Sequence, residues 1–319
     1  FVFTSFGLPY CIGNAKVDYK SHFHEVISSI QVLGFIGSLF LLLLSIVFRE
    51  RLSEIYGLEQ NLVVLVYVYL LFYPSVILMQ EKYKFNFQYK QNVAISIANT
   101  IGAIVLCILF IYIFNDQRYY GRILGLISPM FLMGIYFFIK IFRDGWHAHV
   151  TRYWKYALKI TIPMIPHSFA MVVLGQIDRV MIIKYCGSSD AGLYSFGYTY
   201  AILLSVVSNA VLQAYKPWLY AKYTEKSYES IKHSNKIITL GIAIVTVIIV
   251  TVAPEALKIL GAKSFWGAKV IVMPIAVGVL FQYVYNTYSG LELYHKKTTI
   301  IAIGSVSVAI LNFVLNKTF

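Results

Sequence analysis

An aspartate and an arginine, Asp178 and Arg179, stand side by side inside a long apolar run. Ionisable side chains at membrane depth are rare, and they usually face a bundle interior or a water-filled cavity. Neighbours in sequence point in directions about 100° apart on a helix, so the two cannot share one partner face to face. Two interpretations stay open. The first is structural, with ion pairs to other helices or snorkelling to the outer interface; the second is a cavity in which Arg179 is a fixed cation that suits phosphate. In the second, Asp178 tunes that cation or exchanges a proton.

Polar side chains recur at helical spacing on this run and on three others. One sector of the first helix collects Thr161, His167, Ser168, Gly175, Asp178 and Arg179. One face of the next collects Tyr194, Tyr198, Ser205 and Asn209, and Lys216 continues the same line. Weaker polar faces stand at Asn92, Ser96, Asn99 and Thr100 and at Gln282, Tyr285, Asn286 and Ser289. These faces either hydrogen-bond helix to helix or line one hydrated cavity.

The helices that carry these residues must lie in a membrane. The chain is 59% hydrophobic and 13% charged, with a mean hydropathy of +0.69, whereas soluble domains are roughly 25% charged. Apolar runs of about 20 residues, enough to cross the hydrocarbon core, recur without a polar domain between them. We therefore expect an all-α, polytopic membrane helix bundle and no soluble catalytic module. Nine spans are expected, near 26–48, 61–80, 91–114, 122–142, 159–183, 190–213, 234–253, 267–290 and 298–317.

The net charge of +13 comes from lysines and arginines in the short connections. They concentrate in alternate connections, which the positive-inside rule places in the cytoplasm. Membrane orientation and anionic lipid account for this charge, so no nucleic-acid partner is expected. The three cysteines have neither metal-ligand spacing nor a pairing pattern. We expect no metal site, no cofactor and no catalytic residue.

One basic connection, residues 143–158, divides the chain into two bundles, 1–142 and 159–319. It is either a solvated loop on an anionic leaflet or a hinge between the bundles. Two prolines, Pro163 and Pro166, follow it and are expected to bend the entry of the next span as hinge residues. His147 and His149 lie too close in sequence for a helical metal pair.

A resemblance now adds to this description. The runs I-P-x-x-P-H-S, Q-I-D-R-V-M-I-x-x-Y-x-G, A-G-L-Y-S-F-G-Y and A-Y-x-P-W-L-Y lie between Ile162 and Tyr220. They resemble the start of the second half of bacterial O-antigen and polysaccharide-unit flippases, members of the multidrug/oligosaccharidyl-lipid/polysaccharide exporter superfamily. The rest of the chain matches in hydropathy and helix spacing.

The resemblance implies two pseudo-symmetric bundles of six helices, with the opening spans of the first bundle missing from this fragment. It implies a multi-pass protein of the bacterial inner (plasma) membrane that serves polysaccharide or lipopolysaccharide O-antigen biosynthesis. Such a protein flips undecaprenyl-diphosphate-linked oligosaccharide to the periplasmic leaflet by alternating access. The implied partners are this lipid-linked oligosaccharide, membrane lipids and other polysaccharide assembly proteins.

The family's cationic cavity suggests roles for particular residues. Arg179 and Lys216 are the candidates for binding the diphosphate headgroup. Tyr194, Tyr198 and Asn209 are the candidates for contacting the sugars, and Asp178 is a candidate coupling carboxylate.

Two other functions stay open. A multidrug cation antiporter of the same superfamily would need an acidic cavity, but the carboxylates within spans are Asp178 and the marginal Glu255. A membrane-embedded glycan polymerase or ligase would carry a large periplasmic loop, and the outer connections here are short. No nucleotide-binding loop or phosphotransfer motif is read in the sequence, so the energy for transport is expected from a cation or proton gradient or from consumption of the substrate on the far side.

Overall fold

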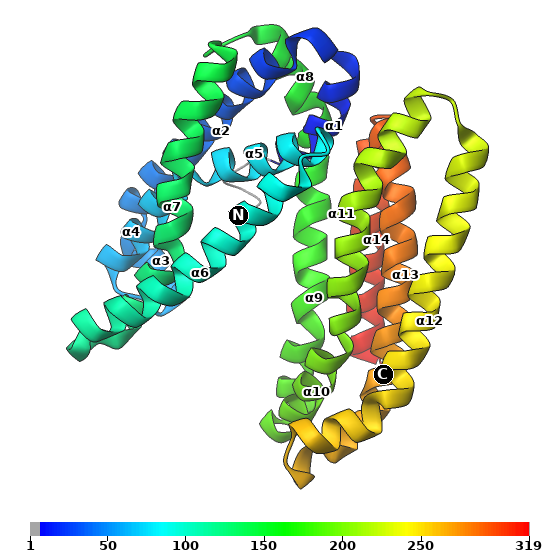
Figure 1. Ribbon diagram of the computed structural model, residues 1–319. Coiled ribbons are helices and arrows are strands. Elements are labelled where there is room, and N and C mark those ends of the chain that lie inside the picture. The colour runs from blue at the N-terminus through cyan, green and yellow to red at the C-terminus, as the bar shows by residue number, and fades with distance from the viewer. Residues whose placement is uncertain (1–6, 319) are drawn as a thin grey trace. The chain divides into compact units, whose positions relative to one another are not determined.

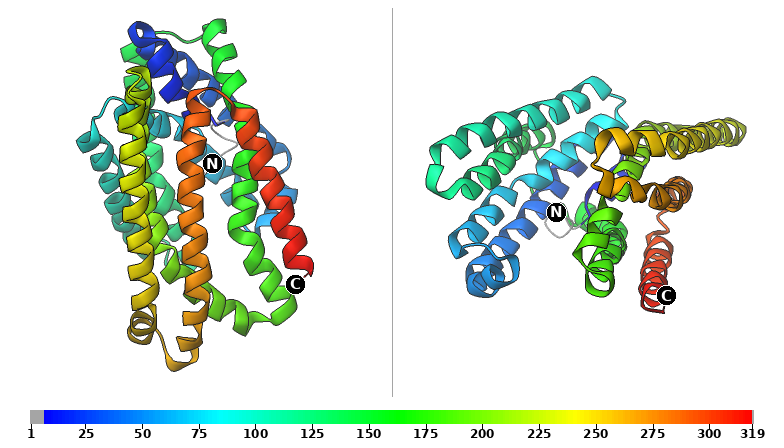
Figure 2. Two further views of the ribbon diagram at one scale, coloured as in Figure 1. Left: turned by 90° about the vertical axis from the view of Figure 1, so that its right-hand side faces the viewer. Right: turned by 90° about the horizontal axis from the view of Figure 1, so that it is seen from below.

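The computed structural model describes residues 7–318, and every regular element among them is helical. This confirms the predicted all-α class. The chain forms two compact units that divide between Ile165 and Pro166, and each is described by itself (Figures 1 and 2).

The first unit contains eight helices among its described residues. Two short 3-10 turns lie between them: η1 (Lys20–His22) between α1 and α2, and η2 (Asn115–Gln117) between α6 and α7. The helices are α1 (Pro9–Asp18), α2 (Phe23–Val47), α3 (Arg49–Tyr56), α4 (Gln60–Leu70), α5 (Tyr73–Phe85), α6 (Tyr89–Ile113), α7 (Arg118–Gly145) and α8 (Thr151–Thr161). The second unit holds α9 (Met164–Cys186), whose first residues precede the division, then α10 (Ser188–Ala201), α11 (Leu203–Thr224), α12 (Tyr228–Leu260), η3 (Lys263–Ala268), α13 (Lys269–Tyr294) and α14 (Thr298–Thr318).

Within residues 7–318, nine helical stretches are long and apolar enough to cross a membrane, as the hydropathy predicted. Three of the predicted spans are interrupted. The span near 61–80 breaks at Leu71 and Phe72, after the end of α4; α5 begins at Tyr73, and Pro74 lies in its first turn. The span near 190–213 breaks at Ile202, between α10 and α11.

A third interruption separates α8 from α9. Helix α8 ends at Thr161, and α9 begins at Met164, so Ile162 and Pro163 stand outside both helices. Pro166 then lies in the first turn of α9, where its missing N–H costs no internal hydrogen bond. The two prolines expected to bend this entry therefore flank the start of a new helix.

Glycines allow α6 and α7 to pack closely side by side (Figure 1). Gly121 and Gly125 lie four residues apart on one face of α7. A Cβ on Gly121 would lie 2.5 Å from the carbonyl oxygen of Phe110, and one on Gly125 would overlap the backbone of Cys107. Because lipid does not drive helices together as water does, such small residues supply the close van der Waals contact.

The core of the second unit lies between α10, α11, α12 and α13. Ala201, Ala253, Ala268 and Ala276 are at most 1% exposed, and their small side chains bring these helices together. Tyr283, 1% exposed, fills the centre between α11, α12 and α13. Large apolar side chains such as Val247 and Phe281 are exposed on the outside, where lipid would cover them.

We expect Gly125→Ala to destabilise the first unit, because its methyl group would meet the α6 backbone. Overpacking of this kind costs about 1–3 kcal/mol, which thermal unfolding in detergent should reveal as a lower Tm. Gly241→Ala on α12 is the matched control, since a Cβ there meets nothing within 4 Å. Equal melting of both variants would contradict the close packing of α6 on α7.

Candidate functional site

Asp178 connects three helices of the second unit. Its carboxylate accepts a hydrogen bond of 3.2 Å from the hydroxyl of Tyr194 on α10 and one of 2.7 Å from the amide Nδ2 of Asn316 on α14. Asn316 also donates to the side-chain oxygen of Asn312, one turn away, at 3.3 Å. The aspartate therefore has neutral partners on two other helices and needs no cation.

Arg179 has a different neighbour. Its guanidinium carbon lies 4.8 Å from the ring centre of Tyr198, a cation–π distance. Its Nε is buried without a hydrogen-bond partner, and it forms no ion pair within the described chain. The two adjacent charges thus act separately, as their angular offset on a helix predicted. The ring centres of Tyr194 and Tyr198 are 5.9 Å apart; Tyr194 contacts Asp178, and Tyr198 contacts Arg179.

Lys216 belongs to a separate group. It lies within electrostatic range of His167, whose ring is 6.4 Å from the ring of Tyr285. His167 stands in the first turn of α9, and twelve residues of helix place Arg179 about 18 Å further along. The structure therefore brings Asp178, Arg179, Tyr194 and Tyr198 together and places Lys216 with another part of α9.

Asn209 lines a polar pocket between α11 and α13. The cavity measures about 50 Å³ and is lined by Ser205, Ser208, Asn209, Val279, Gln282, Tyr283 and Asn286. Two of the polar faces noted in the sequence meet here. The sequence analysis did not include Ser208 and Tyr283. The helical spacing could have found them, because one face of α11 carries 205, 208 and 209, and one face of α13 carries 279, 282, 283 and 286.

Most polar groups of this pocket have no partner among the residues that the structure describes. Ser205 donates to the carbonyl of Ile202 at 2.6 Å. Ser208 is 3% exposed, and its hydroxyl has no partner among the described residues. The side-chain amides of Asn209, Gln282 and Asn286 likewise form no hydrogen bond within the part of the chain described. The pocket is therefore a place where water or a ligand must supply hydrogen bonds.

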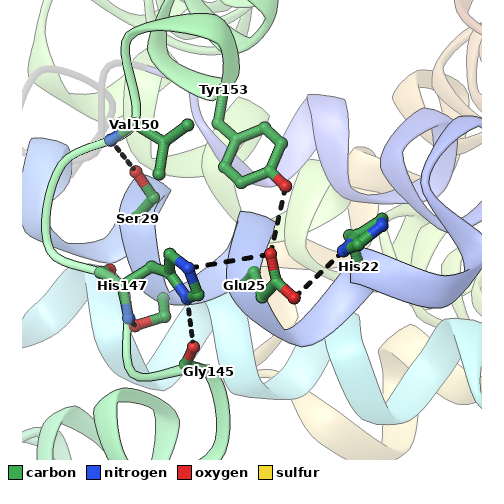
Figure 3. Close-up of polar contacts among 8 residues, drawn as sticks. His22, Glu25, Ser29, Gly145, His147, Val150 and Tyr153 are labelled. Carbon is green, nitrogen blue, oxygen red and sulfur yellow. Dashed lines mark hydrogen bonds and ion pairs between the residues drawn. The ribbon is translucent and has the colours of Figure 1, made fainter.

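The expected linker, residues 143–158, lies within the first unit, where a polar network ties it to α2 (Figure 3). The Glu25 carboxylate is 3.0 Å from Nδ1 of His22 and 3.8 Å from Nε2 of His147, and it accepts a hydrogen bond of 3.2 Å from the Tyr153 hydroxyl. The backbone amide of Val150, the residue that precedes α8, donates to the buried hydroxyl of Ser29 at 3.0 Å. Residues 143–145 close α7 and residues 151–158 belong to α8, which leaves a short connection held at several points.

Removing the hydroxyl of Ser29 should loosen the start of α8. An N–H left buried without an acceptor costs about 1–3 kcal/mol, so we expect Ser29→Ala to speed tryptic cleavage after Arg152. Ser21→Ala, at an exposed serine of the same unit, is the control. Equal cleavage rates for the two variants would show that the Ser29 contact does not hold α8.

Asp178→Ala should lower thermal stability, because the Tyr194 hydroxyl and the Asn316 amide would lose their acceptor at a cost of about 1–3 kcal/mol. Asp178→Asn keeps one acceptor oxygen and should fall between the wild type and the alanine variant. Asp190→Ala, at an exposed carboxylate in the first turn of α10, is the control and should lower the Tm less, because such a carboxylate contributes only about 0.3–1 kcal/mol. The Tm measured in detergent decides, and an unchanged Tm in Asp178→Ala would remove Asp178 as a structural junction.

Comparison with known sequences gives one family and two relatives. A family model described as "Polysaccharide biosynthesis protein" matches residues 1–221. An uncharacterized membrane protein of Haemophilus influenzae is 25% identical over 233 residues, which are 72% of this chain and 51% of that protein. Lsg locus putative protein 1 of the same organism is 31% identical over 71 residues, 22% of this chain and 18% of that protein. The chain thus spans about half the length of the first relative and a smaller part of the second.

Solved structures share the fold. The Vibrio cholerae MATE transporter VcmN in its bent form matches with a TM-score of 0.70 at 12% identity, over 95% of this chain and 74% of that one. A mutant of the same transporter matches with a TM-score of 0.60 at 13% identity, over 99% of this chain and 83% of that one. At such low identity the similarity establishes the fold alone, a multi-pass arrangement of helical bundles as the sequence predicted.

Proposed function

This chain belongs to the polysaccharide biosynthesis protein family, and from that premise we propose that it is part of a flippase for lipid-linked oligosaccharide. The proposed cargo is an oligosaccharide unit on undecaprenyl diphosphate, carried from the cytoplasmic to the periplasmic leaflet of the bacterial inner membrane. The unit would serve polysaccharide or lipopolysaccharide O-antigen assembly. Other polysaccharide assembly proteins would receive it, and membrane lipids would surround the lipid tail.

The observation that carries the proposal is the state of Arg179. It is a permanent cation in an apolar helix, half-buried, with an aromatic neighbour and no carboxylate partner in the described chain. The adjacent Asp178 does not neutralise it, since that carboxylate is held by Tyr194 and Asn316. An uncompensated charge at membrane depth is costly, and a diphosphate would supply two anionic groups that match the guanidinium fork.

Lys216 would act at another stage of the path. It lies with His167 near the opposite end of α9 from Arg179. A diphosphate is much shorter than the roughly 18 Å of helix between His167 and Arg179. The headgroup would therefore meet the two cations in sequence, Lys216 toward the predicted cytoplasmic side and Arg179 further along. Asp178 remains a proposed coupling carboxylate that would change partners as the bundle moves.

Transport by alternating access agrees with the architecture. Two compact units meet in the chain beside the helix break at Ile162 and Pro163, which we propose as the hinge together with Pro166. Polar headgroups and sugars cannot cross hydrocarbon unaided, because each unsatisfied polar group costs several kcal/mol there. Rocking of two bundles around a polar path exposes it to each side in turn.

The alternatives receive less support. A multidrug cation antiporter would offer a free carboxylate, whereas Asp178 is already bound by two neutral donors. A polymerase or ligase would need reactive groups outside the membrane, and the described connections between helices are only a few residues long.

The test replaces Arg179 in the full-length protein and measures delivery of lipid-linked oligosaccharide to the periplasmic leaflet. Loss of a charge-assisted contact worth about 1.5–3 kcal/mol should lower delivery by Arg179→Ala about ten- to a hundredfold. Arg179→Lys should retain part of the activity, because it keeps the charge but loses the fork.

Arg118→Ala, at an exposed arginine of the first unit, is the control and should deliver normally. Full delivery by Arg179→Ala at a normal amount of folded protein would overturn the proposed headgroup contact. Loss of folded protein in Arg179→Ala alone, with normal delivery by Arg179→Lys, would give Arg179 a structural role instead.

A further inference from the structure

Several polar groups in the pocket between α11 and α13 form no hydrogen bond with the described protein. Ser208 is 3% exposed with a hydroxyl that has no partner, and it lines the cavity. Asn209, Gln282 and Asn286 add three amides, each with two N–H donors and a carbonyl acceptor. A group that fills the pocket must therefore both donate and accept hydrogen bonds.

The charge of the lining selects among possible ligands. Among the described residues, no lysine, arginine, histidine, aspartate or glutamate lines the pocket. An anion would find no cation there, and a desolvated cation would find no carboxylate to offset its loss of hydration. A neutral ligand with hydroxyl groups fits, because each hydroxyl is a donor and an acceptor at once.

Size limits how much of such a ligand enters. A cavity of about 50 Å³ holds a few waters, since about 10–15 Å³ of such space is enough for one. It admits a hydroxyl or a hydroxymethyl group but not a whole sugar ring. The ring would remain at the mouth, where Asn209 and Gln282 are exposed and can bond its other hydroxyls.

We propose that this α11–α13 pocket is a subsite for the neutral glycan of the cargo, which takes one hydroxyl or hydroxymethyl group of a sugar edge-on. The proposal rests on the proposed function, since it assigns part of the same cargo to a second place in the second unit. The subsite is distinct from Arg179, which stands on α9 and has no side chain in the pocket. Sugar recognition and headgroup recognition are thereby carried by different helices.

The experiment compares lipids that differ only in the sugar. Purified full-length protein in nanodiscs is titrated with undecaprenyl diphosphate, and with the same lipid carrying one hexose or one N-acetylhexosamine. The variants are Gln282→Leu and Asn286→Leu, which remove hydrogen bonds at similar volume, and Arg179→Ala. Gln91→Leu, at an exposed amide of α6 in the first unit, is the matched control.

We expect the wild type and the control to bind at least one glycosylated lipid about tenfold more tightly than the bare lipid, as one or two hydrogen bonds would give. Both pocket variants should lose this preference and bind the bare lipid normally. Arg179→Ala should weaken binding of bare and glycosylated lipid alike. Gln282 is exposed, so its variant should fold even if the variant at the half-buried Asn286 does not.

Three results would overturn the subsite. If the wild type binds all the lipids equally, or if Gln282→Leu keeps the preference for glycosylated lipid, only water occupies the pocket. If the preference for glycosylated lipid is lost when Na⁺ in the buffer is replaced by choline, the occupant of the α11–α13 pocket is a cation. In each case the proposed function stands if bare-lipid binding still depends on Arg179. Absence of any binding by the wild type would instead remove the proposed function, and the subsite with it.

Discussion

The membrane interior supplies no hydrogen-bond partners, so every polar side chain inside the spans must bind protein, water or a ligand. The chain meets this constraint in three ways. Some hydroxyls bond to their own helix, as Thr246, Thr287 and Ser305 do with carbonyls one turn earlier. Asp178 bonds to other helices. The amides of the α11–α13 pocket do neither within the described chain, so water or a ligand must supply their partners.

The same constraint explains why neighbouring charges need not pair. On α9 the aspartate turns toward α10 and α14, whereas the arginine turns toward the face of Tyr198. Two tyrosines one turn apart on α10 thus have opposite roles: Tyr194 donates through its hydroxyl, and Tyr198 offers its ring. A carboxylate satisfied by neutral donors leaves the positive charge available, which an Asp178–Arg179 ion pair would not.

The sequence predicted the class and the spans because hydropathy adds up residue by residue and needs no knowledge of neighbours. Breaks inside spans were harder, since Leu71, Phe72 and Ile202 are as apolar as the helices they interrupt. In the site, the separation of Asp178 from Arg179 followed from helix geometry alone. The role of Asn316 did not, because an amide in the last span gains meaning only when α14 lies beside α9. Nothing local in the sequence distinguishes the surroundings of Lys216 from those of Arg179.

The firm attachment of α8 to α2 has a mechanical consequence. Hydrogen bonds from Val150 and Trp154 to Ser29 hold the start of α8, and two residues separate its end at Thr161 from the start of α9 at Met164. Each residue brings two soft backbone torsions, and the ring of Pro163 fixes one of them. About three rotatable bonds therefore carry any bending between the two helices. So short a joint has little slack, so bending between α8 and α9 is confined to Ile162 and Pro163 rather than spread over a loop.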